Sequence, residues 1–239
     1  MNQGTYPLAA SMINQVNRLD QISNNLANVN TNGFKQEGTT ETTFNYYLNK
    51  AQEKGEIPTK INTVTNNIPK IDSKFINTEM GPIAMTGNVL DFALNNPDTF
   101  FKIQNANGDI VYTRDGAFKN LDNFLVDGNG NNVLNANNEP ITIEEDVASQ
   151  IGVVKIAYNN LEKIGDNTYI TKNPNQLEVF DNNDNLIVKG AIEKSNVNSV
   201  SVMVELIDAH RRFEQAQKAV KTIDELNASL IEKIGSSTK

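Results

Sequence analysis

The sequence contains no cysteine and no tryptophan among its 239 residues, and it has a single histidine. The absence of cysteine excludes disulfides, thiol nucleophiles and thiolate metal ligands. His210 has no second histidine with which to share a metal, and no nucleophile-elbow motif accompanies it. We therefore expect no catalytic residue, no metal site, no cofactor and no small-molecule substrate.

Basic residues are fewer than acidic ones: the chain has 21 Lys and Arg and 29 Asp and Glu, which gives a formal net charge of −8. Nucleic-acid surfaces need clustered positive charge, so this balance argues against a nucleic-acid partner. No run of about 18 apolar residues occurs, which argues against a transmembrane helix. The N-terminus also lacks the basic start and apolar core of a cleaved secretory signal.

The last long stretch, residues 198–234, carries an apolar pattern that repeats every seven positions without proline or glycine. Its two interleaved series are Leu206, Phe213, Val220, Asn227 and Ile234, and Val202, Ala209, Ala216, Ile223 and Leu230. Such a sustained heptad repeat predicts a coiled-coil helix, and a polar residue such as Asn227 on the seam fixes register. A helix of about 50 Å needs a partner helix to bury this seam.

A second heptad pattern occupies residues 8–29, where Arg18 and Asp20 are the charged residues. Its seam consists of Leu8, Met12, Leu19, Ile22, Leu26 and Val29, with Gln15 as a polar exception. An outer face that is polar but nearly uncharged suits a helix packed on several sides by other protein. We predict that the two terminal helices pair as a coiled-coil core that contacts neighbouring subunits. A helical hairpin within one chain fits the same pattern.

Between the ends, the apolar period changes from seven to two. Residues 37–72 are rich in Thr, Asn and Lys and predict an extended connector, with a short helix at 44–52 and a flexible linker as the alternative. Farther on, short apolar runs alternate with turns such as Asn107-Gly108, which predicts antiparallel strands. The predicted fold class is α+β, with paired terminal helices and a central antiparallel β domain. The predicted domains are 1–36 with 196–239, 37–72, and 73–195.

Two loops rich in side-chain oxygens, residues 127–132 and 181–185, resemble cation-binding loops at first sight. A calcium hand needs alternating ligands, a later glutamate and flanking helices, and these loops lie between strand-like runs instead. We interpret both as hairpin turns.

Two Asn-rich segments stand near opposite ends of the chain: ISNNLANVNTNGFK at residues 22–35, and SNVNSV at 195–200, with MVELI at 203–207 behind it. Their order and spacing resemble the terminal signatures of the bacterial flagellar rod and hook protein family. Residues 86–94 and 112–118 also resemble the family's β domain, but residues 95–98 replace its usual Gly-rich turn. The motif positions are Ser23, Asn24, Asn25, Leu26, Ala27, Asn28, Thr31, Gly33, Phe34, Ser195, Asn196 and Val197.

The resemblance implies a structural subunit of the flagellar basal-body rod and not an enzyme. Such subunits assemble axially through their terminal helices into a hollow shaft that spans the periplasm and transmits torque. They are exported by the flagellar type III apparatus without a cleaved signal peptide. The expected partners are therefore other rod proteins, further copies of this chain and the export apparatus, without direct membrane insertion.

The position within the rod is a finer expectation. Residues 1–18 and 218–222 look most like the members that build the proximal rod, and the distal rod is the alternative. From another class of protein, a soluble coiled-coil adaptor or adhesin with a β head would fit the same arrangement of helices and strands.

Overall fold

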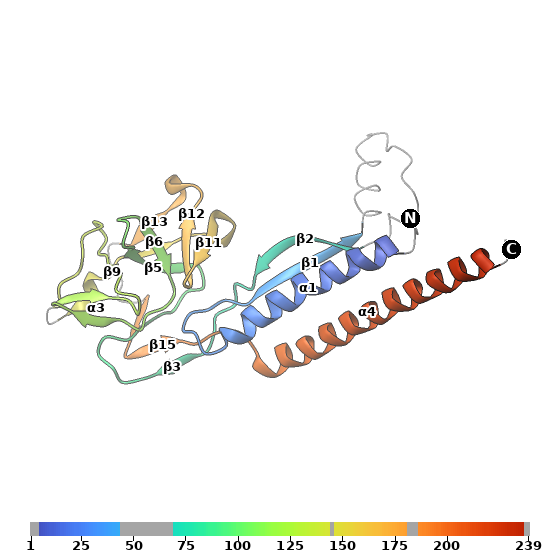
Figure 1. Cartoon of the computed structure of the whole chain (residues 1–239). Coiled ribbons are helices and arrows are strands. Elements are labelled where there is room, and N and C mark those ends of the chain that lie inside the picture. The colour runs from blue at the N-terminus through green and yellow to red at the C-terminus, as the bar shows by residue number, and fades with distance from the viewer. Residues whose placement is uncertain (1–4, 44–68, 144–145, 181–185, 237–239) are drawn as a thin grey trace. The chain divides into compact units, whose positions relative to one another are not determined.

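The computed structural model describes residues 5–43, 69–143, 146–180 and 186–236 (Figure 1). The chain divides into two compact units, which we call the helical unit and the β unit. The described helical unit comprises residues 5–26, 37–43, 69–75 and 199–236. The described β unit comprises residues 27–36, 76–143, 146–180 and 186–198. Each unit is thus built from segments that lie far apart in the sequence.

The helical unit contains two helices and a two-stranded sheet. Helix α1 spans Thr5–Ala27 and helix α4 spans Ser199–Ser236, while β1 (Glu37–Thr43) pairs with β2 (Pro69–Ile76). Both predicted terminal helices are confirmed, but their pairing as a coiled coil is not. The helix predicted at residues 44–52 lies outside the described residues.

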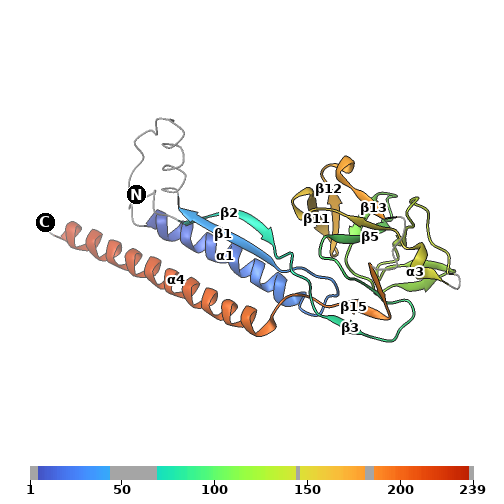
Figure 2. The same cartoon turned by 180° about the vertical axis from the view of Figure 1, so that it is seen from behind.

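Along α4, the red and orange helix of Figures 1 and 2, the predicted seam is the least exposed face. Val202 and Ala209 are buried, and the partly buried seam residues are Leu206, Phe213, Ala216, Val220, Ile223 and Asn227. Farther along, Leu230 is 55% exposed, and the side chain of Ile234 lies outside the described residues. The heptad spacing therefore identifies the inward face of the helix over residues 202–227.

The β unit is built from short strands. They are β3 (Ile83–Met85), β4 (Phe92–Leu94), β5 (Thr99–Gln104), β6 (Ile110–Thr113), β7 (Lys119–Leu121), β8 (Phe124–Val126), β9 (Asn132–Val133), β10 (Val153–Lys155), β11 (Leu161–Gly165), β12 (Thr168–Thr171), β13 (Glu178–Phe180), β14 (Ile187–Lys189) and β15 (Ala191–Glu193). Helix α3 (Val147–Gln150) and two 3-10 helices, Tyr158–Asn160 and Pro174–Gln176, lie between them.

The largest sheet follows the order β11-β12-β6-β5-β9-β8-β7, and β10 joins it by pairing with β5 and β13. Two ribbons, β14-β4 and β15-β3, complete the unit. The registered strand pairs of the β unit run antiparallel, as the turn-rich sequence predicts. The fold of the described residues is therefore α+β with an antiparallel β unit.

The hairpin predicted around Asn107-Gly108 joins β5 to β6, with Lys102 opposite Tyr112. Gly108 has φ of +89°, and the side-chain oxygen of Asn105 accepts the N–H groups of Asn107 and Asp109. Asparagine turns of this kind satisfy the backbone donors that a reversal of the chain leaves unpaired. The Asn-rich composition between apolar runs is thus explained by turn chemistry.

Two clusters of buried side chains form the core of the β unit. The larger one packs Phe92, Phe101 and Phe118 together, with the rings of Phe101 and Phe118 in edge-to-face contact at 5.2 Å between centroids. The smaller one joins Phe100 to Tyr169, again edge to face. Adjacent residues Phe100 and Phe101 thus point into different clusters, as expected for a strand that is buried on both faces.

At Gly116, the backbone lies too close to that of Phe92 to leave room for a side chain. Its carbonyl accepts the N–H of Phe92, and a Cβ on Gly116 would overlap the Phe92 carbonyl oxygen. We expect Gly116→Ala to destabilise the β unit by about 2 kcal/mol or more, measured by urea unfolding, because backbone atoms must move. Gly128→Ala is the matched control, since a Cβ there meets open space. Equal midpoints for the two variants would contradict this packing.

Candidate functional site

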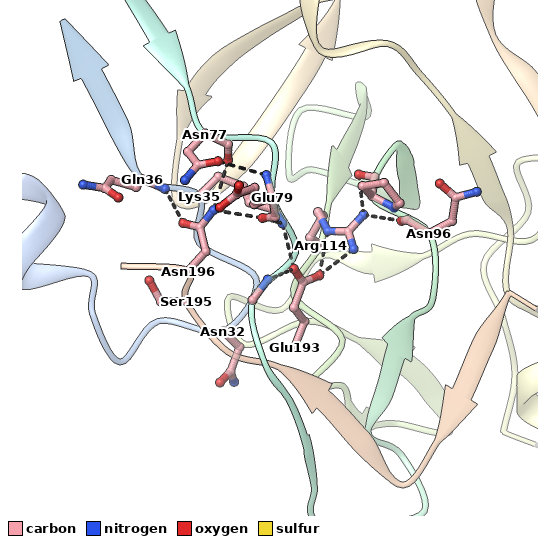
Figure 3. A network of polar contacts seen from close by, with 12 residues as sticks. Asn32, Lys35, Gln36, Asn77, Glu79, Asn96, Arg114, Glu193, Ser195 and Asn196 are labelled. Carbon is pink, nitrogen blue, oxygen red and sulfur yellow. Dashed lines mark hydrogen bonds and ion pairs between the residues drawn. The ribbon is translucent and has the colours of Figure 1, made fainter. Parts of the chain in front are cut away.

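Three charged side chains meet in the interior of the β unit (Figure 3). Lys35 Nζ lies 2.7 Å from Oε1 of Glu193, and Arg114 donates from Nε to Oε2 of Glu193 at 2.7 Å. Arg114 Nη2 forms a further ion-pair contact of 2.6 Å with the same Oε2. The side chains of Lys35 and Arg114 are 0% exposed and that of Glu193 is 1% exposed. We call these three residues the ion cluster.

Backbone groups complete the coordination of the ion cluster. Lys35 Nζ donates to the carbonyl of Glu79 at 2.7 Å, and the Gly81 N–H donates to Oε1 of Glu193 at 2.9 Å. Arg114 Nη1 reaches three carbonyls in one loop and strand, those of Asn96, Pro97 and Thr99. Because the cluster holds two cations and one carboxylate, these carbonyl dipoles compensate the excess positive charge.

Burial also acts on the protonation of the ion cluster. Desolvation lowers the pKa of the Lys35 ammonium, and the negative charge of Glu193 opposes this shift. A buried cation remains charged when an anion and hydrogen bonds replace its water, and Lys35 has both. The lysine, the arginine and the glutamate therefore depend on one another, and none of them is stable there alone.

Gly33 allows the N-terminal segment to reach the cluster. Its φ is +65°, its N–H donates to the Glu193 carbonyl at 2.7 Å, and a Cβ on it would come within 2.6 Å of the Arg114 backbone. Glycine is therefore required there by both conformation and space. The next residue, Phe34, is buried, with Lys163 Nζ 4.1 Å from its ring centroid.

A second network links the two Asn-rich segments. The side-chain oxygen of Asn196 accepts the Gln36 N–H at 2.7 Å, and its amide nitrogen donates to the carbonyls of Asn77 and Glu79. The Asn196 N–H also donates to the carbonyl of Phe34 at 3.2 Å. Ser195 Oγ accepts the N–H of Val197, which shapes the segment before α4. Residues 34–36 and 195–197 are thus fixed to each other within the β unit.

The other motif residues have different surroundings. Asn25, in the helical unit, exchanges two hydrogen bonds with the backbone of Glu37, at 2.7 and 2.9 Å. Thr31 Oγ1 donates to the side chain of Asn28 at 3.1 Å. Ser23, Asn24 and Ala27 are exposed. On the α1 seam, Ile22 is buried and Leu8, Met12, Leu19 and Leu26 are partly buried; Val29, beyond the helix, is also partly buried.

The sequence patterns did not single out the ion cluster. Lys35 and Arg114 lie inside segments that carry the family resemblance, but Glu193 lies just before the C-terminal segment and was not selected. Glu193 follows Ala191 and Ile192, both apolar, in a strand-like run. Lys194 follows Glu193 directly, however, so Glu193 is not an isolated charge in this run, and neither its burial nor its partners can be read from the sequence.

The described residues offer no alternative site of obvious chemistry. Among them, no group of three or more His, Cys, Asp and Glu side chains could hold a metal ion. The Asp127 carboxylate accepts the N–H groups of Asn129 and Asn131, which confirms a hairpin turn at 127–132, whereas residues 181–185 lie outside the described part. None of the described helices combines the length and the apolar character that a membrane span requires.

Comparison with known proteins relates the chain to components of the flagellum. Three family models match it: "Flagella basal body rod protein" at residues 9–35, "Flagellar hook protein FlgE/F/G D1 domain" at 96–156, and "Flagellar basal body rod FlgEFG protein C-terminal" at 188–232. The first and third matches include Lys35 and Glu193, and the second includes Arg114. The ion cluster therefore draws one residue from each matched segment.

Similar proteins match along almost the whole chain. The flagellar basal-body rod protein FlgF of Caulobacter vibrioides is 30% identical over 236 residues, which cover 91% of each chain. FlgF of Rhizobium meliloti is 30% identical over 99% of this chain and 100% of its own. The flagellar basal-body rod protein FlgG of Bacillus subtilis is 31% identical over 97% of this chain and 98% of its own.

Removing the anion of the ion cluster should be costly. Glu193→Gln leaves two buried cations without their carboxylate, and we expect a loss of about 3 kcal/mol or more in the free energy of unfolding, measured in urea. Glu178→Gln is the control, because Glu178 pairs with Lys155 at 3.6 Å on the surface, where a pair contributes about 1 kcal/mol or less. Similar losses in both variants would mean that the ion cluster does not hold the β unit together.

Asp115, next to Arg114, should make stability depend on pH. Burial raises the pKa of the Asp115 carboxyl, assisted by the charges of Asp127 and Asp91 and opposed by hydrogen bonds from Ala117 and Asn32. Because the folded state holds this proton more tightly than the unfolded chain does, stability is lost as the pH rises from the ordinary aspartate pKa to the raised pKa of Asp115. Asp115→Asn should therefore raise the urea midpoint at pH 7, and the gain should vanish below the ordinary aspartate pKa. Asp109→Asn, in an exposed turn, should show no such gain, and a gain at pH 7 that persists at low pH would refute the assignment.

Proposed function

The chain belongs to the flagellar basal-body rod protein family, and on this premise we propose that it builds the proximal rod by axial self-assembly through its terminal helices. It is a structural subunit of the flagellar basal body and not an enzyme, and it interacts with other basal-body components. The proposal has three further parts: assembly through the terminal helices, position within the rod, and the route of export.

The exposure of α4 is the observation that supports assembly through the helices. Its seam is only partly buried from Phe213 to Asn227, and Leu226, Leu230 and Ile231 are exposed. Apolar side chains left half exposed along a helix of 38 residues gain stability when other helices cover them. The helices of neighbouring subunits supply that cover in our proposal.

Repeated contacts of this kind determine the form of the assembly. When one surface of a subunit binds a different surface of the next, the contacts continue along a helix unless the rotation closes a ring. We infer that such contacts build a hollow shaft that crosses the periplasm and transmits torque. The seam residues on α1 and α4 named above would then be interface residues, and the helical unit, which includes most of residues 1–36 and 196–239, would form the core domain.

Position and export are the remaining parts of the proposal. The likeness of residues 1–18 and 218–222 to proximal members supports the proximal rod, and labelling this chain in isolated basal bodies distinguishes it from the distal position. We propose export by the flagellar type III apparatus without cleavage. The resemblance of residues 22–35 and 195–200 to the rod family supports this route. An intact N-terminal segment in the assembled protein is the expected result.

Charge placed on the α4 seam tests the assembly model. Phe213→Asp or Val220→Asp should abolish swimming and incorporation into basal bodies, because a carboxylate without a partner cannot be buried cheaply between helices. Gln217→Asp, at an exposed position of the same helix, should assemble normally. Amide hydrogen exchange on each purified variant should show unchanged protection in residues 76–143, since the β unit is not altered. Normal swimming of the seam variants would exclude assembly through this face.

A further inference from the structure

The two most exposed large apolar side chains among the described residues are four positions apart in the β unit. Val89 is 80% exposed and Met85 is 74% exposed, and Ile83 on the same strand as Met85 is also exposed. We call these three residues the apolar edge. Large apolar groups gathered on the surface indicate a contact site more often than scattered ones do.

Strand β3 leaves one of its edges unpaired in the part of the chain that the structure describes. It pairs with β15 alone, with Ala84 opposite Ile192. The Lys194 N–H donates to the Pro82 carbonyl, and the Thr86 N–H donates to the Gly190 carbonyl. Hydrogen-bonded positions alternate along an antiparallel strand, so the backbone groups of Ile83 and Met85 face away from β15. A free edge with apolar side chains is suited to another chain.

The loop that presents Val89 is held in a fixed shape. Buried Asp91 accepts hydrogen bonds from Thr86 Oγ1 at 2.6 Å and from the side-chain amide of Asn88 at 3.0 Å. The N–H groups of Thr86 and Gly87 both donate to the Gly190 carbonyl. These hydrogen bonds fix the loop in the conformation that exposes Val89. A surface ordered in advance loses less entropy on binding, which favours a role in recognition.

The charge of the chain indicates what covers this surface. Residues 80–90 contain no charged side chain, although the chain carries a net charge of −8. Copies of an acidic protein repel one another wherever their charged faces meet, so contacts between copies favour charge-free surfaces. The cores of protein interfaces are also poor in Lys, Glu and Asp and enriched in Met. A basic partner would instead select an acidic surface.

We propose that the apolar edge is a contact surface on which a second copy of this chain packs in the assembled rod. This inference rests on the proposed function and adds to it the face of the β unit that meets a neighbour. Ile164 provides a matched control, because it is 50% exposed in the same unit but stands among Glu162, Lys163 and Asp166. The comparison is between an apolar side chain in a charge-free segment, residues 80–90, and one in a charged segment, residues 162–166.

Site-specific photo-crosslinking in the living bacterium tests the proposal on the full chain. A benzophenone amino acid is placed at position 85, 89 or 164, and basal bodies are isolated after irradiation. We expect adducts between two copies of this chain from positions 85 and 89, at several times the yield from position 164. Adducts with a different protein would overturn the second copy as the occupant. Yields no higher than that of position 164, in basal bodies that contain the chain, would overturn the surface.

A charge substitution gives an independent measurement. Val89→Asp should weaken association between copies at least about tenfold and reduce swimming, whereas Ile164→Asp should not. Both variants should keep the urea midpoint of the original chain, because both side chains are exposed. Normal swimming by Val89→Asp would count against the apolar edge alone. Absence of the unaltered chain from basal bodies would overturn the proposed function, and this inference with it.

Discussion

The β unit depends on one buried carboxylate, that of Glu193, which binds Lys35 and Arg114 at distances of 2.6–2.7 Å. Arg114 and Glu193 are 79 positions apart and Lys35 and Glu193 are 158 positions apart, so no two of the three residues are near in sequence. A buried ion cluster is weak evidence for stability gained relative to an apolar core, but it makes the removal of any one member costly. The ion cluster therefore forms only when residues 33–36 and residues 191–196 are both docked in the β unit.

This condition explains what the Asn-rich terminal segments do. Gly33, Phe34 and Asn196 bind the backbone and interior of the β unit instead of a ligand, so the motifs that carry the family resemblance have a folding role in this structure. Their polar side chains satisfy backbone groups at sharp changes of chain direction. The long helix α4 begins directly after them and has several exposed apolar side chains. A well-packed β unit and a helix with exposed apolar side chains are consistent with a structural subunit.

Charged residues are unevenly distributed along the chain. The chain is acidic overall, yet charged side chains are absent from residues 1–17, 80–90 and 195–204. Several exposed apolar side chains lie in these stretches, among them Ile13, Met85, Val89 and Val200. Repulsion between like charges disfavours contacts elsewhere, so a charge-free stretch directs where copies can meet. Burying a few apolar groups at each contact is sufficient when the contact is repeated in every subunit of an assembly.

The sequence by itself determined the features that depend on neighbouring residues along the chain. The heptad spacing identified both terminal helices and the inward face of α4, and the Asn107-Gly108 turn identified the β5–β6 hairpin, because helix faces and tight turns are set by local periodicity and backbone preference. Tertiary structure alone decided the rest. Nothing within a few residues of Glu193 shows that its partners are residues 35 and 114, since an ion pair is chosen by distance in space. The free edge of β3 is equally invisible in the sequence, because an edge is defined by the strand that does not lie beside it.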